Sequence, residues 1–273
     1  MTPDNEELSR LRDIALAAGE LQMAERDRLR SIDYKSATDM VTDLDRRVEA
    51  LLVEHFARAF PEDGVRGEEG ASSPGTSGSV WHIDPLDGTT NYVHRHPFFA
   101  VSLGREASGE IDLAAVYAPE LDELYLARAQ GGAVLERPLR GTRRDLPPRE
   151  TVTLERALLA TGFPYVRDEL VARNCDLLKS FLLRQCHGVR RGGSAAIDLC
   201  HVAAGRLDGY WEFALNTWDL AAGSLIAREA GARVSDFDGG GGYLDGHQIL
   251  AAAPGLHEAM LEIISETLRH ADA

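Results

Sequence analysis

One short segment, WHIDPLDGTTNY at residues 81–92, constrains the fold of this chain more than any other. The residues before Asp84 predict a strand, and a residue that precedes proline is held extended, so Asp84 should end that strand. Pro85 cannot donate the next ladder hydrogen bond, and the chain should turn there. Asp87 follows closely, so the turn can direct both carboxylates toward one point. Carboxylates that close repel each other unless a proton or a cation lies between them.

The residues around this turn suit a metal ion beside a phosphate. Ligands that are all oxygen select hard cations, Mg²⁺ first, and the Leu86 carbonyl can add a neutral ligand. Gly88, Thr89 and Thr90 offer backbone N–H groups and hydroxyls, and a helical turn that starts there would also favour an anion. A metal next to a phosphate cradle indicates phosphoryl transfer. The same residue types also occur in a capped turn without a ligand, so this segment alone leaves both interpretations open.

Composition argues against several classes of function. The net charge is −15 and the pI is about 5.0, which argues against a nucleic-acid-binding protein and against adsorption to anionic membranes. The sequence has no apolar run of the ~18–20 residues that a membrane span needs, and its acidic, polar beginning is unlike a signal peptide. Cys175, Cys186 and Cys200 form no CxxC pair, and we expect reduced, mostly buried thiols in a cytoplasmic protein.

Hydrophobic spacing predicts the elements of the first half. Two helices are expected at residues 7–27 and 45–60, and Pro61 ends the second. The small, polar residues 71–79 indicate a loop. Strands that together predict an antiparallel meander are expected at residues 80–84, 98–106, 110–119, 123–130 and 133–137.

The second half predicts a different arrangement. Residues 137–150 are basic and contain prolines, and we expect an exposed connection there, with contact to an anionic partner as the alternative. Strands and helices alternate after it, which predicts a layered α/β structure. The expected strands cover residues 155–163, 187–191 and 206–214, with short ones within 232–240 and 247–254, and the expected helices cover 168–183, 194–205, 218–232 and 255–270.

Carboxylates elsewhere in the chain indicate the same chemistry. Glu68 lies in RGEEG at residues 66–70, and Asp219 lies in NTWDLAAG at residues 216–223. Taken alone, Glu68 would be a solvated turn residue and Asp219 a favourable residue at a helix N-terminus. Four groups of motifs carry a resemblance: GEE, DPLDGTTNY followed by HPFFAVSLG, GGSAAIDLCHVAAGRLDGYWE, and WDLAAG. Through these motifs, and through their order and spacing, the chain resembles the inositol monophosphatase family from about residue 35 to residue 231.

The resemblance implies a site that holds two or three Mg²⁺ ions. The positions that match the family's metal ligands are Glu68, Asp84, the Leu86 carbonyl, Asp87 and Asp219. Glu68 and Thr89 resemble the catalytic pair that orients the attacking water, and Gly88 with Thr89 resembles the phosphate cradle. Asp45 matches a catalytic-site aspartate just outside the metal ligands. Lys35 matches a lysine on a mobile loop, with an ordinary surface lysine as the alternative.

The later motifs imply the substrate contacts. The positions that match the family's substrate-binding residues are Asp87, Gly193, Ser194, Ala195, Glu212 and Asp219. Glu212 would accept hydrogen bonds from substrate hydroxyls, which is a usual contact between a carboxylate and a polyol. Ser194 stands where the family often has Thr, Asn216 where it often has His, and Tyr92 where Phe is common. These differences concern substrate preference rather than the chemistry.

The fold that the resemblance implies is the αβαβα sandwich of the sugar phosphatases, an α/β (α+β) arrangement. An antiparallel sheet is expected in the first half and a smaller mixed sheet in the second. We expect one domain over residues 1–273, with the metal and phosphate motifs in 1–145 and the substrate side in 146–273. The family also implies a homodimer and inhibition by lithium.

The activity that the resemblance implies is Mg²⁺-dependent hydrolysis of inositol monophosphate or a related sugar or polyol phosphate. The same superfamily also contains phosphatases of histidinol phosphate, fructose 1,6-bisphosphate and 3′-phosphoadenosine 5′-phosphate, and these substrates are the first alternatives. A regulatory protein that binds RNA or a transcription complex on the same fold is a further alternative, because function depends on sites rather than on folds.

Overall fold

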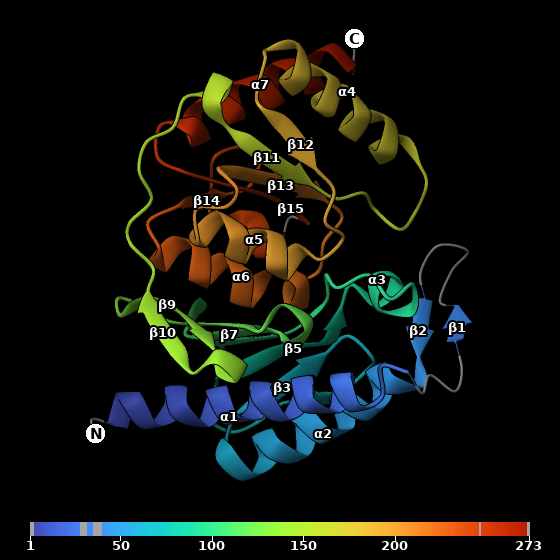
Figure 1. Ribbon diagram of the computed structural model, residues 1–273, viewed down its shortest axis with the longest axis vertical. Helices are drawn as coiled ribbons and strands as arrows, with labels where there is room; N and C mark the ends of the chain where they lie inside the picture. The colour runs from blue at the N-terminus through green and yellow to red at the C-terminus, as the bar shows by residue number, and fades with distance from the viewer. Residues whose placement is uncertain (1–2, 28–31, 35–39, 246, 272–273) are drawn as a thin grey trace.

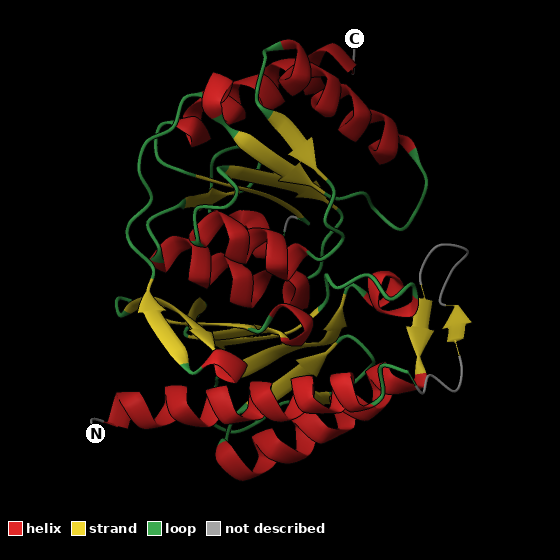
Figure 2. Ribbon diagram, viewed as in Figure 1, coloured by secondary structure: helices red, strands yellow, loops and turns green. Residues whose placement is uncertain are grey.

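Helices and sheets alternate in five layers in the computed structural model (Figures 1 and 2). The structure describes residues 3–27, 32–34, 40–245 and 247–271. Two helices cover each outer face, and two more lie between the sheets. From one face to the other, the helix pairs are α1 (Pro3–Ala24) with α2 (Asp43–Ala59), α5 (Ala195–Ala203) with α6 (Thr217–Glu229), and α4 (Glu169–Leu183) with α7 (Leu256–Ala271). The predicted αβαβα sandwich is confirmed, although α1 covers residues 3–24 rather than 7–27.

The first sheet has eight strands in the order β10-β9-β8-β7-β6-β5-β3-β4. In chain order the strands are β3 (Gly64–Gly67), β4 (Ser72–Ser73), β5 (Val80–Asp87), β6 (Ala100–Ala107), β7 (Glu110–Ala118), β8 (Glu123–Arg128), β9 (Gly132–Arg137) and β10 (Thr142–Asp145). Neighbouring strands are antiparallel except for the parallel pair β3 and β5. The predicted antiparallel meander from β5 to β9 is confirmed. Strands β3 and β4 are additional, and β4 lies in the predicted loop at residues 71–79.

Residues 142–145 correct the prediction of an exposed connection over the whole of 137–150. They form the edge strand β10, which pairs antiparallel with β9. The reversal between the two strands uses Gly141, whose φ of 62° costs glycine little, so the chain can fold back and pair. The strand remains exposed, and its Arg143 Nη1 lies 3.1 Å from Glu136 Oε1. Part of the basic charge in this region is therefore balanced within the molecule.

Strand β5 continues past the point at which the sequence predicts its end. Asp84 pairs with Ser102 of β6 and Asp87 pairs with Ala100, so a β-bulge or irregularity lies between the two aspartates. Pro85 lies inside it, where its missing N–H interrupts no regular ladder bond. The proline therefore bends the strand rather than ending it.

The second sheet has five strands in the order β12-β11-β13-β15-β14. In chain order they are β11 (Leu158–Thr161), β12 (Gly188–Arg190), β13 (Gly209–Phe213), β14 (Arg233–Ser235) and β15 (Gln248–Ala252). Strand β11 is parallel to β12 and β13, whereas β15 is antiparallel to β13 and β14. The predicted smaller, mixed sheet is confirmed. A separate two-stranded ribbon joins β1 (Ile32–Tyr34) to β2 (Met40–Thr42).

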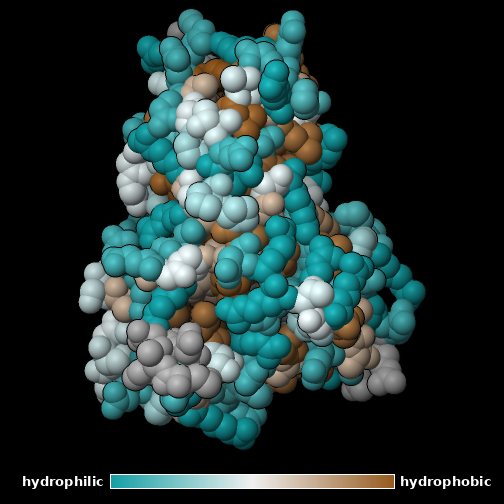
Figure 3. Space-filling view, turned by 60° about the vertical axis from the view of Figure 1, so that its left-hand side comes forward, coloured by the Kyte–Doolittle hydropathy of each residue, from teal (hydrophilic) through white to brown (hydrophobic). Residues whose placement is uncertain are grey.

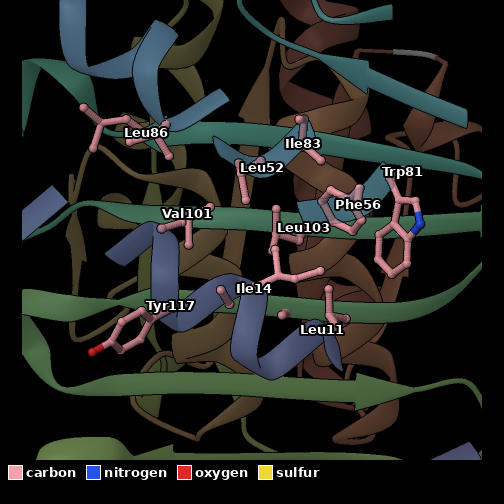
Figure 4. Packing of buried hydrophobic residues seen from close by; sticks show 14 of the residues in the cluster. Leu11, Ile14, Leu52, Phe56, Trp81, Ile83, Leu86, Val101, Leu103 and Tyr117 are labelled. Atoms are coloured by element: carbon pink, nitrogen blue, oxygen red, sulfur yellow. The ribbon is translucent and has the colours of Figure 1, made fainter. Parts of the chain in front are cut away.

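The hydrophobic cores follow the layers. One cluster fills the space between the first sheet and α1 and α2, where Leu11, Phe56 and Trp81 are almost fully buried (Figure 4). A second cluster joins α5 and α6 to the opposite face of the same sheet through small residues such as Ala114 and Ala221. Helices from the second half of the chain therefore pack on the sheet of the first half, which brings residues distant in sequence together.

The surface in Figure 3 is mostly hydrophilic, with smaller hydrophobic areas between the polar side chains. No helix in the described part of the chain is long and apolar enough to cross a membrane. Cys175, Cys186 and Cys200 are free thiols, and the last two are buried, as the sequence predicts for most of them.

Candidate active site

Alternation along β5 determines which residues reach the centre of the molecule. Trp81 and Ile83 belong to the cluster under α1 and α2 (Figure 4), so His82 and Asp84 face the opposite side, toward α6. Asp84 is 1% exposed, and its Oδ1 accepts a hydrogen bond of 2.8 Å from the Leu86 N–H. The bend after Asp84 thus orients this carboxylate through its own backbone.

Asp87 joins the two halves of the chain. Its Oδ2 accepts hydrogen bonds from Ser194 Oγ at 2.6 Å and from the Ala196 N–H at 2.7 Å. Ser194 is also the N-cap of α5, where its Oγ accepts from the Ile197 N–H. The substrate turn that the sequence predicts therefore also holds a predicted metal ligand, because the N-terminus of α5 offers free donors to an anion.

Asp219 lies in the first turn of α6. Its Oδ2 accepts a hydrogen bond of 2.7 Å from the Asn216 N–H and completes a capping box with the N-cap residue Asn216. The same hydrogen bond would occur at an ordinary helix N-terminus. Asp219 differs from an ordinary capping residue because it lines the same pocket as Asp84 and Asp87.

A pocket of about 100 Å³ lies where β5, the N-termini of α5 and α6 and the end of β13 meet. Eleven of the thirteen residues to which the sequence assigns a role line it: Glu68, Asp84, Leu86, Asp87, Gly88, Thr89, Gly193, Ser194, Ala195, Glu212 and Asp219. Asp45 lies behind Thr89 instead, and Lys35 lies outside the described residues. The predicted set, apart from Lys35, is therefore gathered in one place.

Thr89 and Asp45 form a buried hydrogen-bonded pair. Thr89 Oγ1 lies 3.0 Å from Asp45 Oδ1 and also 3.0 Å from the Leu86 carbonyl oxygen. Asp45 in turn closes the capping box at the start of α2, because its Oδ2 accepts from Thr42 Oγ1 and the Thr42 N–H. Burial raises the pKa of Asp45 even though these donors oppose the shift. The threonine hydroxyl is thus held between a carboxyl group and the motif backbone.

Acidic side chains are concentrated in this pocket. The pKa of Asp84 is raised well above its usual value, first by burial and then by Glu68, Asp87 and Asp219. Burial also raises the pKa of Asp87 to about 6 and that of Asp219 well above its usual value. Ionised carboxylates at these positions need a compensating cation.

The donor set fits a hard divalent cation. Its side chains are four carboxylates from three segments of the chain, and the Leu86 carbonyl lies in the same pocket, so every candidate ligand is oxygen. Among the described residues, no three His, Cys, Asp or Glu side chains already converge as a metal-binding group. The fit therefore rests on ligand chemistry and on the raised pKa values of buried carboxylates.

Several pocket residues received no role from the sequence. Phe163 and Tyr165 come from the loop after β11, and Trp218 comes from the first turn of α6. The sequence offered one signal for Phe163 and Tyr165: they are aromatic residues at or just after the end of a predicted strand, where pocket residues often lie. Asn91 was also missed: its Nδ2 donates to the Phe98 carbonyl at 2.6 Å and to the Gly192 carbonyl at 3.0 Å, and so ties the glycine turn to the first motif.

The floor of the pocket is built around Glu212. Its Oε2 accepts a hydrogen bond from the Tyr210 hydroxyl, and Glu212 is 8% exposed. A side chain at Gly162 would collide with it, since a Cβ there would lie 2.0 Å from Glu212 Oε1. Burial raises the pKa of Glu212 to about 7. Gly162 and Tyr210 therefore define the position of this carboxylate.

Comparisons with known proteins agree with this geometry. The profile of the "Inositol monophosphatase family" matches residues 4–269. The "Nus factor SuhB" of Pseudomonas aeruginosa is 40% identical over 262 residues, which cover 93% of this chain and 94% of that protein. The extragenic suppressor protein suhB of Bartonella henselae has a TM-score of 0.87 at 33% identity, covering 94% of this chain and 98% of that one. The IMPase of Thermotoga maritima has a TM-score of 0.85 at 28% identity, covering 98% and 99%.

The profile spans nearly the whole chain, and the similar structures share its layers. The chain belongs to the inositol monophosphatase family.

Proposed function

We propose that the protein is a Mg²⁺-dependent phosphomonoesterase that hydrolyses inositol monophosphate or a related sugar or polyol phosphate. The observation that carries this proposal is the gathering of Asp84, Asp87, Asp219 and Glu68 around one pocket that Thr89 also lines. Family membership supports the reaction class, and the all-oxygen donor set supports Mg²⁺ as the metal.

Glu68, Asp84, Asp87, Asp219 and the Leu86 carbonyl would hold two or three Mg²⁺ ions. Bound Mg²⁺ neutralises phosphate charge, favours ionisation of water and stabilises the leaving oxygen. The backbone N–H groups of Gly88 and Thr89 would bind the phosphate. Because water would be the nucleophile and bound Mg²⁺ would stabilise the leaving oxygen, the chain needs no nucleophilic side chain of its own.

Thr89 would orient the attacking water. When its hydroxyl donates to Asp45 Oδ1, a lone pair of Thr89 Oγ1 is left to accept a hydrogen bond from the water. Glu68 lines the same pocket and would serve as the second acceptor. Thr89→Val should lower kcat about 100-fold, the lower end for a proton-handling group, whereas Thr89→Ser should retain most of the activity. Equal activity of the two variants in a steady-state assay would exclude this role.

The substrate side would be formed by Gly193, Ser194, Ala195 and Glu212. Glu212 would accept from two hydroxyls of the substrate, which favours polyols over simple phosphate esters. A panel of inositol monophosphate, histidinol phosphate, fructose 1,6-bisphosphate and 3′-phosphoadenosine 5′-phosphate, compared by kcat/KM, tests this. A preference for the adenosine bisphosphate would contradict the assignment, and adding Li⁺ to the same panel tests the expected inhibition.

The metal assignment has its own test. Asp219→Asn and Glu68→Gln should each lower turnover with Mg²⁺ by at least about 100-fold, because each removes a charged ligand. Turnover near the wild-type value in either variant would remove the basis of the proposal.

A role in a transcription complex is the second candidate. It is favoured by the name "Nus factor SuhB" of the Pseudomonas aeruginosa relative. One experiment separates the two functions: the Asp219→Asn variant is compared with wild type in pull-downs against RNA polymerase and against RNA. If wild type and Asp219→Asn both capture RNA polymerase or RNA, the second function is supported. If wild type captures neither, the second function is excluded.

We infer that the protein is a cytoplasmic homodimer under either function, and sedimentation tests the oligomeric state.

A further inference from the structure

A buried histidine lies in the layer between β5 and α6. His82 is 2% exposed and lies on the face of β5 that also carries Asp84. The surroundings on that side are small apolar residues of the sheet and of α6, such as Ala114 and Ala221. A buried imidazole is costly unless its nitrogens are hydrogen-bonded.

Both ring nitrogens of His82 have partners. Nδ1 lies 2.9 Å from Thr217 Oγ1, and Nε2 lies 2.9 Å from Glu106 Oε2. An ionised carboxylate can only accept, so Nε2 carries a proton and donates to Glu106. In the neutral ring Nδ1 then accepts from the Thr217 hydroxyl. The ring thus links the first residue of α6 to Glu106, near the end of β6.

Two further contacts hold the same end of α6 against the sheet. Ser102 Oγ donates to the Trp218 carbonyl at 3.1 Å. Gly104 allows the helix to approach closely, because a Cβ there would lie 2.7 Å from the Ala221 Cβ. Thr217, Trp218 and Ala221 flank Asp219, and Ser102 pairs with Asp84 in the ladder. The contacts therefore involve residues next to Asp219 on α6 and near Asp84 on the sheet.

We propose that His82 is a positioning residue that joins the start of α6 to β5 and so sets the distance between Asp84 and Asp219, two of the residues that would hold Mg²⁺. The inference rests on the proposed Mg²⁺ site. Asp84 and Asp219 repel each other when both are ionised, and they lie on β5 and α6, which are far apart in the sequence. The hydrogen bond between His82 and Thr217 joins these two elements and so limits how far apart the two carboxylates can move. An apolar side chain could fill the same layer but would not direct the helix.

Thr217 offers a matched pair of variants for the test. Thr217→Val keeps the shape but removes the hydroxyl, and Thr217→Ser keeps the hydroxyl. Mg²⁺ binding to the whole protein, without substrate, is measured by isothermal titration calorimetry. Thr217→Val should bind Mg²⁺ about 3- to 10-fold more weakly, at or below the loss seen when groups bonded directly to metal ligands are removed, and Thr217→Ser should bind like wild type.

Two more variants separate positioning from stability. His82→Gln retains one polar group but cannot span both partners, and it should weaken Mg²⁺ binding as Thr217→Val does. Ile226→Val removes a buried methyl group from α6 away from these contacts, so it should lower the melting temperature without changing Mg²⁺ affinity.

The outcomes are distinguishable. Weaker binding by Thr217→Val and His82→Gln, with normal binding by Thr217→Ser and Ile226→Val, supports the proposal. Normal Mg²⁺ affinity in Thr217→Val and His82→Gln overturns it and leaves the phosphatase proposal standing. Equal losses in Thr217→Ser and Thr217→Val also overturn it, because the hydroxyl would not matter. Absence of Mg²⁺ binding by the wild type would overturn the metal site and this inference together.

Discussion

Glu212 is the residue whose ionisation should be visible in the stability of the molecule. Burial raises its pKa from 4.5 to about 7, so the folded protein binds a proton there more tightly than the unfolded chain does. The resulting stabilisation is complete below pH 4.5 and is lost as the pH rises through about 7. Its size is on the order of 3 kcal/mol in the free energy of unfolding.

Glu212→Gln should abolish this pH dependence. Urea unfolding of metal-free wild type and variant at several pH values between 4 and 8 gives the difference in unfolding free energy, which should change in favour of the variant as the pH rises. Tyr210→Phe removes a donor that lowers the pKa of Glu212, so it should move the transition to higher pH. Parallel pH profiles for Glu212→Gln and wild type would contradict the burial argument.

At the same scale, the sequence identified the acidic residues of the pocket better than the residues that hold them in place. Asp84 and Asp87 were identifiable because a strand, a proline and two carboxylates stand together in eight residues of β5. The link from Asp87 to Ser194 spans 107 residues, and the link from His82 to Thr217 spans 135. No local pattern contains such pairs, because side-chain periodicity describes only residues that are near neighbours in the chain.

The turn between β5 and α3 (Thr89–Val93) depends on the conformation of Gly88. Its φ is 90°, and a Cβ there would lie 2.9 Å from the Phe98 carbonyl oxygen. Gly88→Ala should therefore destabilise the protein by about 2–4 kcal/mol, the left-handed conformation and the collision each contributing, and it should lower phosphatase activity by displacing Thr89.

Gly109 provides the control for this prediction. Its φ is 82°, but a Cβ there would meet nothing within 4 Å. Gly109→Ala should cost only about 1 kcal/mol for the left-handed conformation and leave activity unchanged. Chemical denaturation of both variants tests the difference, and equal costs would show that the collision at Gly88 is relieved.

Element boundaries show the same division between local and distant causes. Helix α6 and strands β6 to β9 follow from hydrophobic spacing, and the structure contains them. Strand β10 does not follow, because TRRD has no apolar alternation and pairs through its backbone with β9. Strand β5 runs through Pro85 because β6 continues beside it, which a proline rule applied to one segment cannot anticipate.

On the scale of the molecule, Glu123 holds the two halves together. It lies on β8 at 3% exposure, and its carboxylate receives Arg206 Nη1 and Nη2 at 2.5 and 2.6 Å and Arg137 Nη2 at 2.8 Å. Burial alone would raise its pKa, but hydrogen bonds from His201 and Arg206 outweigh that effect and lower it. The contribution of Glu123 to stability should therefore persist above pH 4.5 and be lost in acid.

Glu123→Gln should lower the unfolding free energy at pH 7 by about 2–3 kcal/mol, at or below the usual loss for a broken buried ion pair, since Arg206 can still reach solvent. Glu54→Gln removes the partner of Arg58 in an exposed pair on α2 and should cost less than about 0.5 kcal/mol. Guanidinium unfolding of the two variants measures the contrast. Similar losses would mean that burial adds nothing to the Glu123 contact.

The sequence by itself determined which acidic residues stand beside the turn after Asp84 and where most helices and strands lie, because both follow from short patterns: carboxylates beside a proline, and apolar spacing with period 2 or 3.6. Only the tertiary structure decided how those carboxylates meet. The packing of α5 and α6 on the first sheet brings Ser194 to Asp87 and Thr217 to His82. Such contacts arise when layers bury their apolar faces against each other, and that burial is a property of the whole chain rather than of any one segment.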